Sequence, residues 1–307
     1  MKKILTILLI IAAGYSFGQQ DPLFSQYMFN KLAVNPGYAG SREALSADIL
    51  GRLQWVGING APRTISASVH SPLRNQHIAL GLTAYQDDLG PTIFQGGLAT
   101  VAYRILFADS RLSFGLQAGV KRGSIDWQDP EMDPLDPTDQ LLNQQLRDKI
   151  IPDVNFGVYY YADNYYVGVS SKQLLQNKIM VVDNEDADQF THLLRHFYGM
   201  AGMAIPMTDG VMFRPSILVK YVQHAPAQMD LNANFLFANT FAVGASYRTE
   251  KALSLMTELK ITKSLRIGYA YDIWFNELKA YNTGSHELRI GFDLETLQNR
   301  MRTPRYF

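Results

Sequence analysis

The stretch Gln228 to Phe237, QMDLNANFLF, decides the fold because its side chains alternate strictly between two kinds. One set is polar and consists of Gln228, Asp230, Asn232 and Asn234. The other set is apolar and consists of Met229, Leu231, Ala233, Phe235 and Phe237. A strand directs successive side chains to opposite faces, so a period of two predicts a strand with one polar and one apolar side. Residues 111–121 repeat the pattern.

Two architectures produce such strands. A soluble sandwich or barrel turns its apolar faces inward, whereas a membrane barrel turns them outward to lipid. The alternating segments are about nine to thirteen residues long, which suits a tilted crossing of a bilayer. Their polar faces are rich in Gly, Ser, Thr, Asn and Gln rather than in charged residues alone. We therefore predict an all-β protein, a transmembrane antiparallel β-barrel.

The pattern predicts about fourteen strands. They cover roughly 43–55, 63–71, 77–86, 92–106, 111–125, 153–161, 165–171, 195–206, 211–222, 227–237, 241–248, 252–261, 265–273 and 286–294. Every second connection is a tight turn, at 108–110, 162–164, 208–210, 238–240 and 262–264, whereas the others include long ones at 126–152, 172–194 and 274–285. Outer-membrane barrels segregate periplasmic turns from extracellular loops in this way. An even number of strands then places both termini in the periplasm.

The bulk composition excludes several classes of protein. The chain has 307 residues with 28 basic and 28 acidic side chains, so it lacks the basic excess that binding to nucleic acid requires. It has no cysteine, which excludes thiolate catalysis, iron–sulfur clusters and disulfides. After Arg42 no run of about 20 apolar residues occurs, and the mean hydropathy is −0.10, so no bundle of membrane helices is expected.

The N-terminus has the features of a secretory signal. Lys2 and Lys3 precede an apolar run from Ile4 to Ala13, and the small residues Ser16 and Gly18 follow on either side of Phe17. This run is too short to remain as a membrane anchor. We expect residues 1–18 to be a cleaved signal peptide, with the mature chain starting near Gln19.

No motif in the chain indicates catalysis. The segment 126–139, DWQDPEMDPLDPTD, is either a solvated loop or a calcium site, and Leu141 to Ile151 is a short helical candidate. His192 and His196 are four residues apart, either as metal ligands on a helix or as two polar histidines at the barrel rim. The chain has no nucleophile elbow, P-loop or dinucleotide fingerprint. We expect no enzyme and no cofactor.

Two further groups of side chains follow from the barrel prediction. Aromatic residues near strand ends predict an interfacial girdle, formed by Trp55, Tyr103, Tyr159, Tyr160, Tyr161, Tyr165, Tyr166, Trp274 and Phe275. Polar residues that face the lumen either line a pore or fill the interior, namely Asp230, Asn232, Asn234, Glu258, Lys260, Arg266 and Glu287.

Several blocks of the sequence resemble the PorP/SprF family of outer-membrane β-barrels. These blocks are DPLFSQYMFNKLAVNPGYAGS (21–41), GRLQWVGINGAPRTISASVHSPL (51–73), RPSILVKYVQHAPAQMDLNANFLF (214–237), GSHELRIGFDL (284–294) and the terminal TPRYF (303–307). The resemblance extends over nearly all of the mature chain. It is least in the long loops.

The resemblance implies a non-enzymatic component of the type IX secretion system of Bacteroidota-type bacteria. Such a component would lie in the outer membrane of a Gram-negative cell, in contact with lipid. It would assist the export or surface attachment of large secreted proteins, especially adhesins with a C-terminal sorting domain, and some members are associated with gliding motility. Periplasmic secretion components or peptidoglycan-binding components are further implied partners. A passive channel or a transporter of hydrophobic solutes is the alternative.

The segment before the first strand, residues 19–42, carries the candidate functional residues. Its apolar side chains recur at roughly helical spacing and are Leu23, Phe24, Tyr27, Met28, Phe29 and Leu32. Asn35-Pro36-Gly37 then ends the helix. We expect this segment at the periplasmic mouth, either as a plug or as a docking surface for a periplasmic partner. The docking residues would be Phe24, Tyr27, Met28, Phe29, Asn35 and Pro36. The barrel would occupy residues 43–294 and a periplasmic tail residues 295–307.

Overall fold

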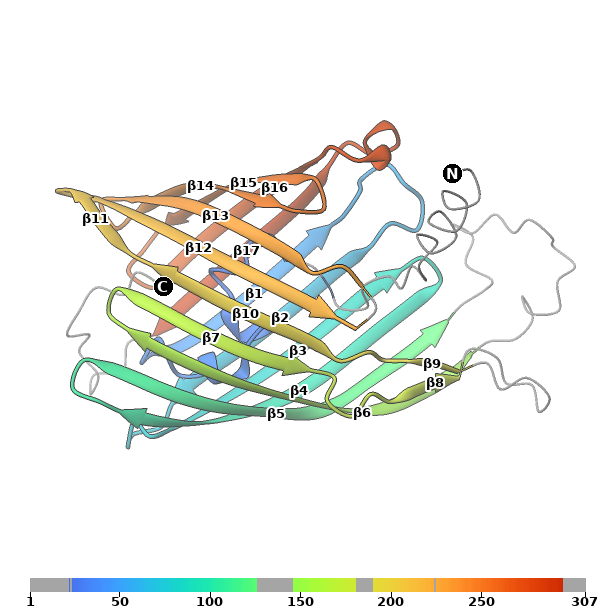
Figure 1. Ribbon diagram of the computed structural model, residues 1–307, viewed down its shortest axis with the longest axis horizontal. Coiled ribbons are helices and arrows are strands. Elements are labelled where there is room, and N and C mark those ends of the chain that lie inside the picture. The colour runs from blue at the N-terminus through green and yellow to red at the C-terminus, as the bar shows by residue number, and fades with distance from the viewer. Residues whose placement is uncertain (1–21, 23, 126–145, 181–189, 224, 295–307) are drawn as a thin grey trace, which may run out of the picture.

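A single antiparallel sheet closes on itself into a barrel (Figure 1). The computed structural model describes residue 22 and residues 24–125, 146–180, 190–223 and 225–294. The strands up to the first long hairpin are β1 (Leu45–Leu53), β2 (Arg63–Pro72), β3 (Ile78–Leu89), β4 (Thr92–Leu106), β5 (Ser110–Ile125), β6 (Leu146–Ala162) and β7 (Tyr165–Lys172). The remaining barrel strands are β10 (His196–Met203), β11 (Ile205–Thr208), β12 (Val211–Val222), β13 (Gln228–Phe237), β14 (Phe241–Arg248), β15 (Ala252–Lys260), β16 (Leu265–Trp274) and β17 (Ser285–Leu294).

The barrel has fourteen crossings among the described residues, because β11 continues β10 after the single residue Ala204. Each strand pairs with its neighbour in the chain, β10 pairs with β12, and β1 pairs with β17 to close the ring. This confirms the predicted fold class. Three strands, β4, β12 and β14, have the predicted boundaries, and most others differ by one to three residues at either end.

The apolar faces of the strands point outward and the polar faces point into the lumen. In β13, Asp230 and Asn234 are each 1% exposed, whereas the outward Leu231 is 46% exposed. The same alternation of buried and exposed residues runs through β1, β2 and β17. Apolar surface on the outside of a closed barrel suits contact with lipid. Among the described residues no helix is long and apolar enough to cross a membrane.

The connections at the two ends of the barrel differ in length. The turn end carries the connections 73–77, 107–109, 163–164, 209–210, 238–240 and 261–264. The loop end carries 54–62, 90–91, 126–145, 173–195, 223–227, 249–251 and 275–284. All the long connections are therefore at one end, although three of the loop-end connections are short.

The structure corrects two predictions about the long connections. Residues 146–151, predicted as part of a short helix, belong to β6, which extends beyond the barrel rim by pairing with β5. The predicted loop 172–194 contains a small hairpin of β8 (Lys178–Met180) and β9 (Phe190–His192). The candidate calcium segment 126–139, the signal peptide and the C-terminal tail lie outside the described residues.

The predicted aromatic girdle is only partly correct. Tyr103 is 55% exposed and Phe275 is 51% exposed, and both lie on the outside as predicted. Four of the predicted girdle residues are instead buried inside the barrel, namely Tyr159, Tyr161, Tyr166 and Trp274. The reason is the alternation itself, since within β6 only every second member of the run 159–161 faces outward.

Candidate functional site in the barrel lumen

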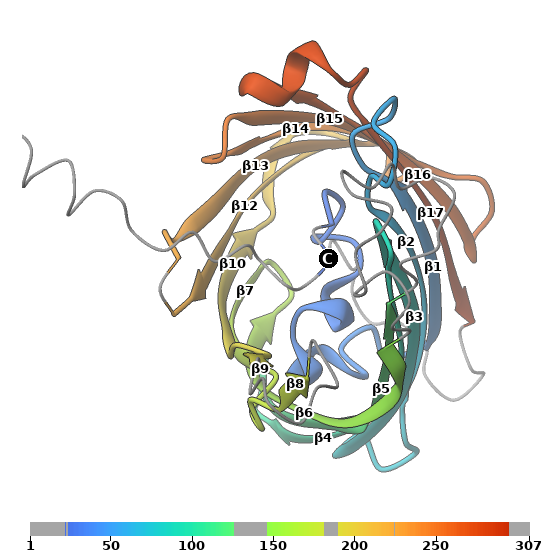
Figure 2. The same cartoon turned by 90° about the vertical axis from the view of Figure 1, so that its right-hand side faces the viewer.

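The described part of the segment before β1, Pro22 and residues 24–42, lies inside the barrel (Figure 2). We call this part the plug. It consists of turns and two short 3₁₀-helices, η1 (Lys31–Ala33) and η2 (Pro36–Tyr38). The predicted helix is therefore wrong, because contacts with the barrel wall replace regular helical hydrogen bonds. The predicted position at the mouth is also wrong, since the plug spans much of the lumen.

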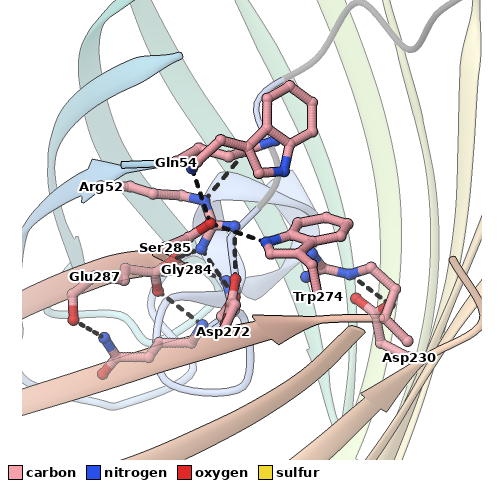
Figure 3. A network of polar contacts seen from close by, with 12 residues as sticks. Arg52, Gln54, Asp230, Asp272, Trp274, Gly284, Ser285 and Glu287 are labelled. Carbon is pink, nitrogen blue, oxygen red and sulfur yellow. Dashed lines mark hydrogen bonds and ion pairs between the residues drawn. The ribbon is translucent and has the colours of Figure 1, made fainter. Parts of the chain in front are cut away.

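At its start the plug is held by carboxylates near the loop end. The backbone N–H groups of Ser25 and Gln26 each donate to the Glu287 carboxylate at 2.8 Å. The Ser25 hydroxyl donates to both oxygens of Asp272 at 2.8 Å. Arg52 joins the two carboxylates, at 2.7 Å from Asp272 and 3.0 Å from Glu287 (Figure 3). Hydrogen bonds to ionised groups are stronger than neutral ones, so this network anchors the start of the plug.

In the middle of the lumen an arginine cluster surrounds an aromatic ring of the plug. The guanidinium of Arg289 pairs with Asp48 and, at 2.6 Å, with Glu258. The ring of Phe29 lies 5.5 Å from the Arg289 guanidinium and 5.6 Å from that of Arg214. Both distances suit cation–π contacts. Charged wall residues thus hold an apolar plug residue.

The Asn35-Pro36 turn fits a cradle made by glycines of the wall. The Asn35 amide donates to the carbonyls of Val158 on β6 and Val169 on β7, at 3.0 and 3.2 Å. Its side-chain oxygen also accepts from the N–H of Gly37 at 2.8 Å. A Cβ at Gly115 would lie 2.2 Å from the Pro36 carbonyl carbon. The backbone of the plug approaches the wall this closely because that wall residue has no side chain.

The end of the plug is fixed near the turn end. Arg42 donates to both oxygens of Asp293, at 3.0 and 2.8 Å. Asp293 also accepts from Ser46 at 2.6 Å and pairs with Arg266 at 2.8 Å. The N–H of Gly40 donates to Nδ1 of His70 at 3.0 Å. The plug therefore has polar anchors along its whole described length.

A buried lysine, Lys31, lies on the plug itself. Lys31 is 1% exposed, and its ammonium donates to the Met28 carbonyl at 2.7 Å and lies 4.7 Å from the centre of the Tyr166 ring. Burial, assisted by nearby guanidinium groups such as that of Arg42, holds the pKa of Lys31 well below its usual range.

The predicted docking residues all lie inside the barrel. Tyr27 is 1% exposed, Met28 and Phe29 are 6% exposed, Asn35 is fully buried, Pro36 is buried, and Phe24 is half-buried. Docking of a partner to these side chains stays a prediction and would require the plug to move. Ser25, Gln26 and Arg42 are polar anchors that the sequence pattern does not predict. Their partners lie on the last strands of the chain, so no local pattern marks them.

Most of the predicted lumen residues fill the interior. Asp230 pairs with Lys220 at 2.9 Å and with Arg248 at 3.0 Å, in a buried cluster. Lys260, by contrast, is exposed at the turn end. His196 is buried, stacks on Tyr198 and contacts the Leu194 carbonyl, while the side chain of His192 lies outside the described part. The described lumen is thus packed by the plug and by ion pairs.

Comparison with solved structures supports the fold. The monoaromatic hydrocarbon channel CymD has a TM-score of 0.51 and 13% identity, over 91% of this chain and 95% of that one. The outer membrane protein Omp33 of Acinetobacter baumannii (TM-score 0.47, 9% identity, 82% and 99% covered) and a Pseudomonas aeruginosa FadL homologue (0.47, 10%, 92% and 96%) are less similar. These likenesses concern the barrel architecture alone.

Comparison with known sequences gives the family. The sequence matches none of the curated proteins with which it was compared. The family model described as type IX secretion system membrane protein PorP/SprF matches residues 16–292. This range includes the plug and the barrel as far as Phe292 in β17, which confirms the resemblance seen in the sequence blocks. The chain belongs to the PorP/SprF family of outer-membrane proteins of the type IX secretion system.

Proposed function

We propose that this component of the type IX secretion system assists the export or surface attachment of particular large proteins that carry a C-terminal sorting domain. Adhesins, including those used in gliding motility, are the expected cargo. The loop end would face the cell exterior and recognise the cargo through residues 126–152, 172–194 and 274–285. Long connections on a rigid barrel are common places for specificity.

The plugged lumen is the observation that favours this role over a passive channel. The plug is bound by Glu287 and Asp272 near one end and by Asp293 near the other. A barrel filled in this way offers surfaces for binding rather than a wide path for solutes. The turn end would then face the periplasm and contact other secretion components, such as peptidoglycan-binding proteins.

Exchange of one fully described loop tests cargo recognition. In the connection 275–284, Phe275 is 51% exposed and Tyr281 is 74% exposed. In a strain without the native gene, a variant with Gly-Ser residues throughout 275–284 should fold but should not return one large protein to the cell surface. The matched control has Gly-Ser residues at the turn-end connection 261–264 and should return that protein to the surface. Surface proteomics measures the outcome, and unchanged secretion of every sorting-domain protein in the deletion strain would contradict the proposal.

The proposed orientation has its own test. The chain has no cysteine, so an introduced one can be labelled without background. A membrane-impermeant maleimide on intact cells should label Tyr281→Cys at the loop end and should not label Ile261→Cys, whose native side chain is 50% exposed at the turn end. Labelling of Ile261→Cys alone would mean that the barrel is inserted the other way.

A further inference from the structure

Two connections at the loop end are bonded to each other beside the closing seam of the barrel. The connection 54–62 follows β1 and the connection 275–284 precedes β17, so both are attached to the strand pair that closes the ring. The Val56 N–H donates to the Gly284 carbonyl at 2.9 Å, and the Thr283 N–H donates to the Val56 carbonyl at 2.8 Å. The Thr283 hydroxyl also donates to that carbonyl, at 3.1 Å. The two connections therefore form one hydrogen-bonded unit, which we call the loop pair.

Ser285 connects the loop pair to a residue that holds the start of the plug. Ser285 is fully buried, and its hydroxyl accepts from the backbone N–H of Trp55 at 3.1 Å and from the indole N–H of Trp274 at 3.0 Å (Figure 3). Its register partner on β16 is Asp272. The carboxylate of Asp272 accepts the hydroxyl of Ser25 in the plug. The anchor of the plug thus lies next to the base of the loop pair.

Trp55 is strained while the loop pair is closed. Its φ is +49°, a left-handed conformation that is rare for a bulky side chain. Its indole N–H is buried without a hydrogen-bond partner among the described residues, and its ring packs edge-on against Trp274 at 5.7 Å between centroids. Such strain persists only where the surroundings impose it, and an unpaired buried donor would gain a hydrogen bond in water. Separation of the two connections would therefore relax Trp55.

We propose that the loop pair is a clamp on the start of the plug. While the two connections are bonded, Ser285 and Asp272 stay in the register that receives Ser25. When the connections separate, this anchor loosens and the start of the plug can move away from the wall. The strain at Trp55 lowers the free energy needed to open the clamp, so a partner that binds the open loops more tightly shifts the equilibrium. The identity of that partner as cargo rests on the proposed function, whereas the clamp itself does not.

The end of the plug is held by other contacts. The N–H groups of Tyr38 and Ala39 donate to the carbonyls of Asn35 and Pro36, at 3.1 and 3.2 Å, within the plug itself. The ion pair from Arg42 to Asp293 lies near the turn end. None of these contacts involves the loop pair. Opening the clamp should therefore free the start of the plug and leave its end in place.

Hydrogen–deuterium exchange of the purified full-length protein in a maltoside detergent tests the clamp. Ser285→Ala removes the acceptor that the two tryptophans share. Exchange of the Ser25 and Gln26 amides should become about tenfold faster, the change expected from the loss of one hydrogen bond. Exchange of the amides at the end of the plug should not change. Ser246→Ala, which alters a buried lumen serine of β14, is the matched control and should change neither.

A second variant covers the case in which Ser285→Ala does not fold, as judged by heat-modifiable migration on gels. Trp274→Phe keeps an aromatic ring against Trp55 but lacks the N–H that donates to Ser285, so exchange at the start of the plug should again be faster. Unchanged exchange there in either folded variant, or equal acceleration at both ends of the plug, would overturn the proposal. The measurement involves no cargo, so it can fail while the loop-exchange test of cargo recognition succeeds, and the reverse.

Discussion

Glu287 contacts both the plug and the strand pair β1–β17 that closes the barrel. It accepts two backbone hydrogen bonds from the plug, and it pairs with Arg52, its register partner on β1. Two further polar contacts bridge the same seam between β1 and β17, from Asp48 to Arg289 and from Ser46 to Asp293. The lumen side of the closing seam is therefore connected by polar contacts at three levels.

Glu287→Gln should destabilise the folded barrel by about 3 kcal/mol, since removing the charge leaves the buried Arg52 with one of its two carboxylate partners. The amide keeps the shape of the carboxylate, so packing should not change. The midpoint of heat-modifiable migration measures the loss. Glu250→Gln, in the 249–251 turn at the loop end, is the control and should change the midpoint little. Equal midpoints for both variants would show that the seam network adds no net stability.

Lys31 should make the stability of the plugged barrel depend on pH. Burial lowers the pKa of Lys31 in the folded protein below its ordinary value of about 10.5. Between these two values the unfolded chain binds more protons than the folded one, so stability rises with pH across that window. Lys31→Met should remove this part of the rise, as measured by thermal midpoints at neutral and alkaline pH. Parallel pH curves for the two proteins would contradict the prediction.

At the scale of elements, the plug and the wall are fitted to each other at Gly115. A Cβ there would meet the backbone of Pro36, which cannot rotate away as a side chain could. Gly115→Ala should therefore cost about 1–3 kcal/mol or more, the range for overpacking. It should also expose the plug, so that a cysteine at Phe24 reacts faster with maleimide.

The control for Gly115→Ala is another strand glycine. A Cβ at Gly97, on the outer face of β4, has no atom within 4 Å. Gly97→Ala should change stability by less than about 0.5 kcal/mol, as expected for a surface site. If both alanine variants behave alike, the plug does not rest against β5 in the membrane-inserted protein.

For the molecule as a whole, the packed lumen predicts low conductance. The intact protein should give no steady large currents in planar bilayers, because the plug and the ion pairs fill the described interior. A variant that lacks residues 22–38 and still folds should conduct, because the strands alone leave a lumen between that of packed and open barrels. Steady large currents from the intact protein would favour the channel alternative.

Much of the barrel could be predicted from the sequence, because its determinants are local. Alternation with a period of two is a property of neighbouring residues, and lipid requires every outward face to be apolar. The strands β4, β12 and β14 could thus be delimited without a structure. The girdle prediction is wrong for Tyr159 and Tyr161, because alternation along β6 turns both into the lumen although they lie near a strand end.

The sequence by itself determined the approximate position of most barrel strands and which face of each meets lipid. Only the tertiary structure decided that the plug fills the lumen, that its described residues form no α-helix, and that Ser25 meets Glu287. Those two residues are 262 positions apart. Their contact depends on the register of every intervening strand and on closure between β1 and β17, which no local pattern encodes.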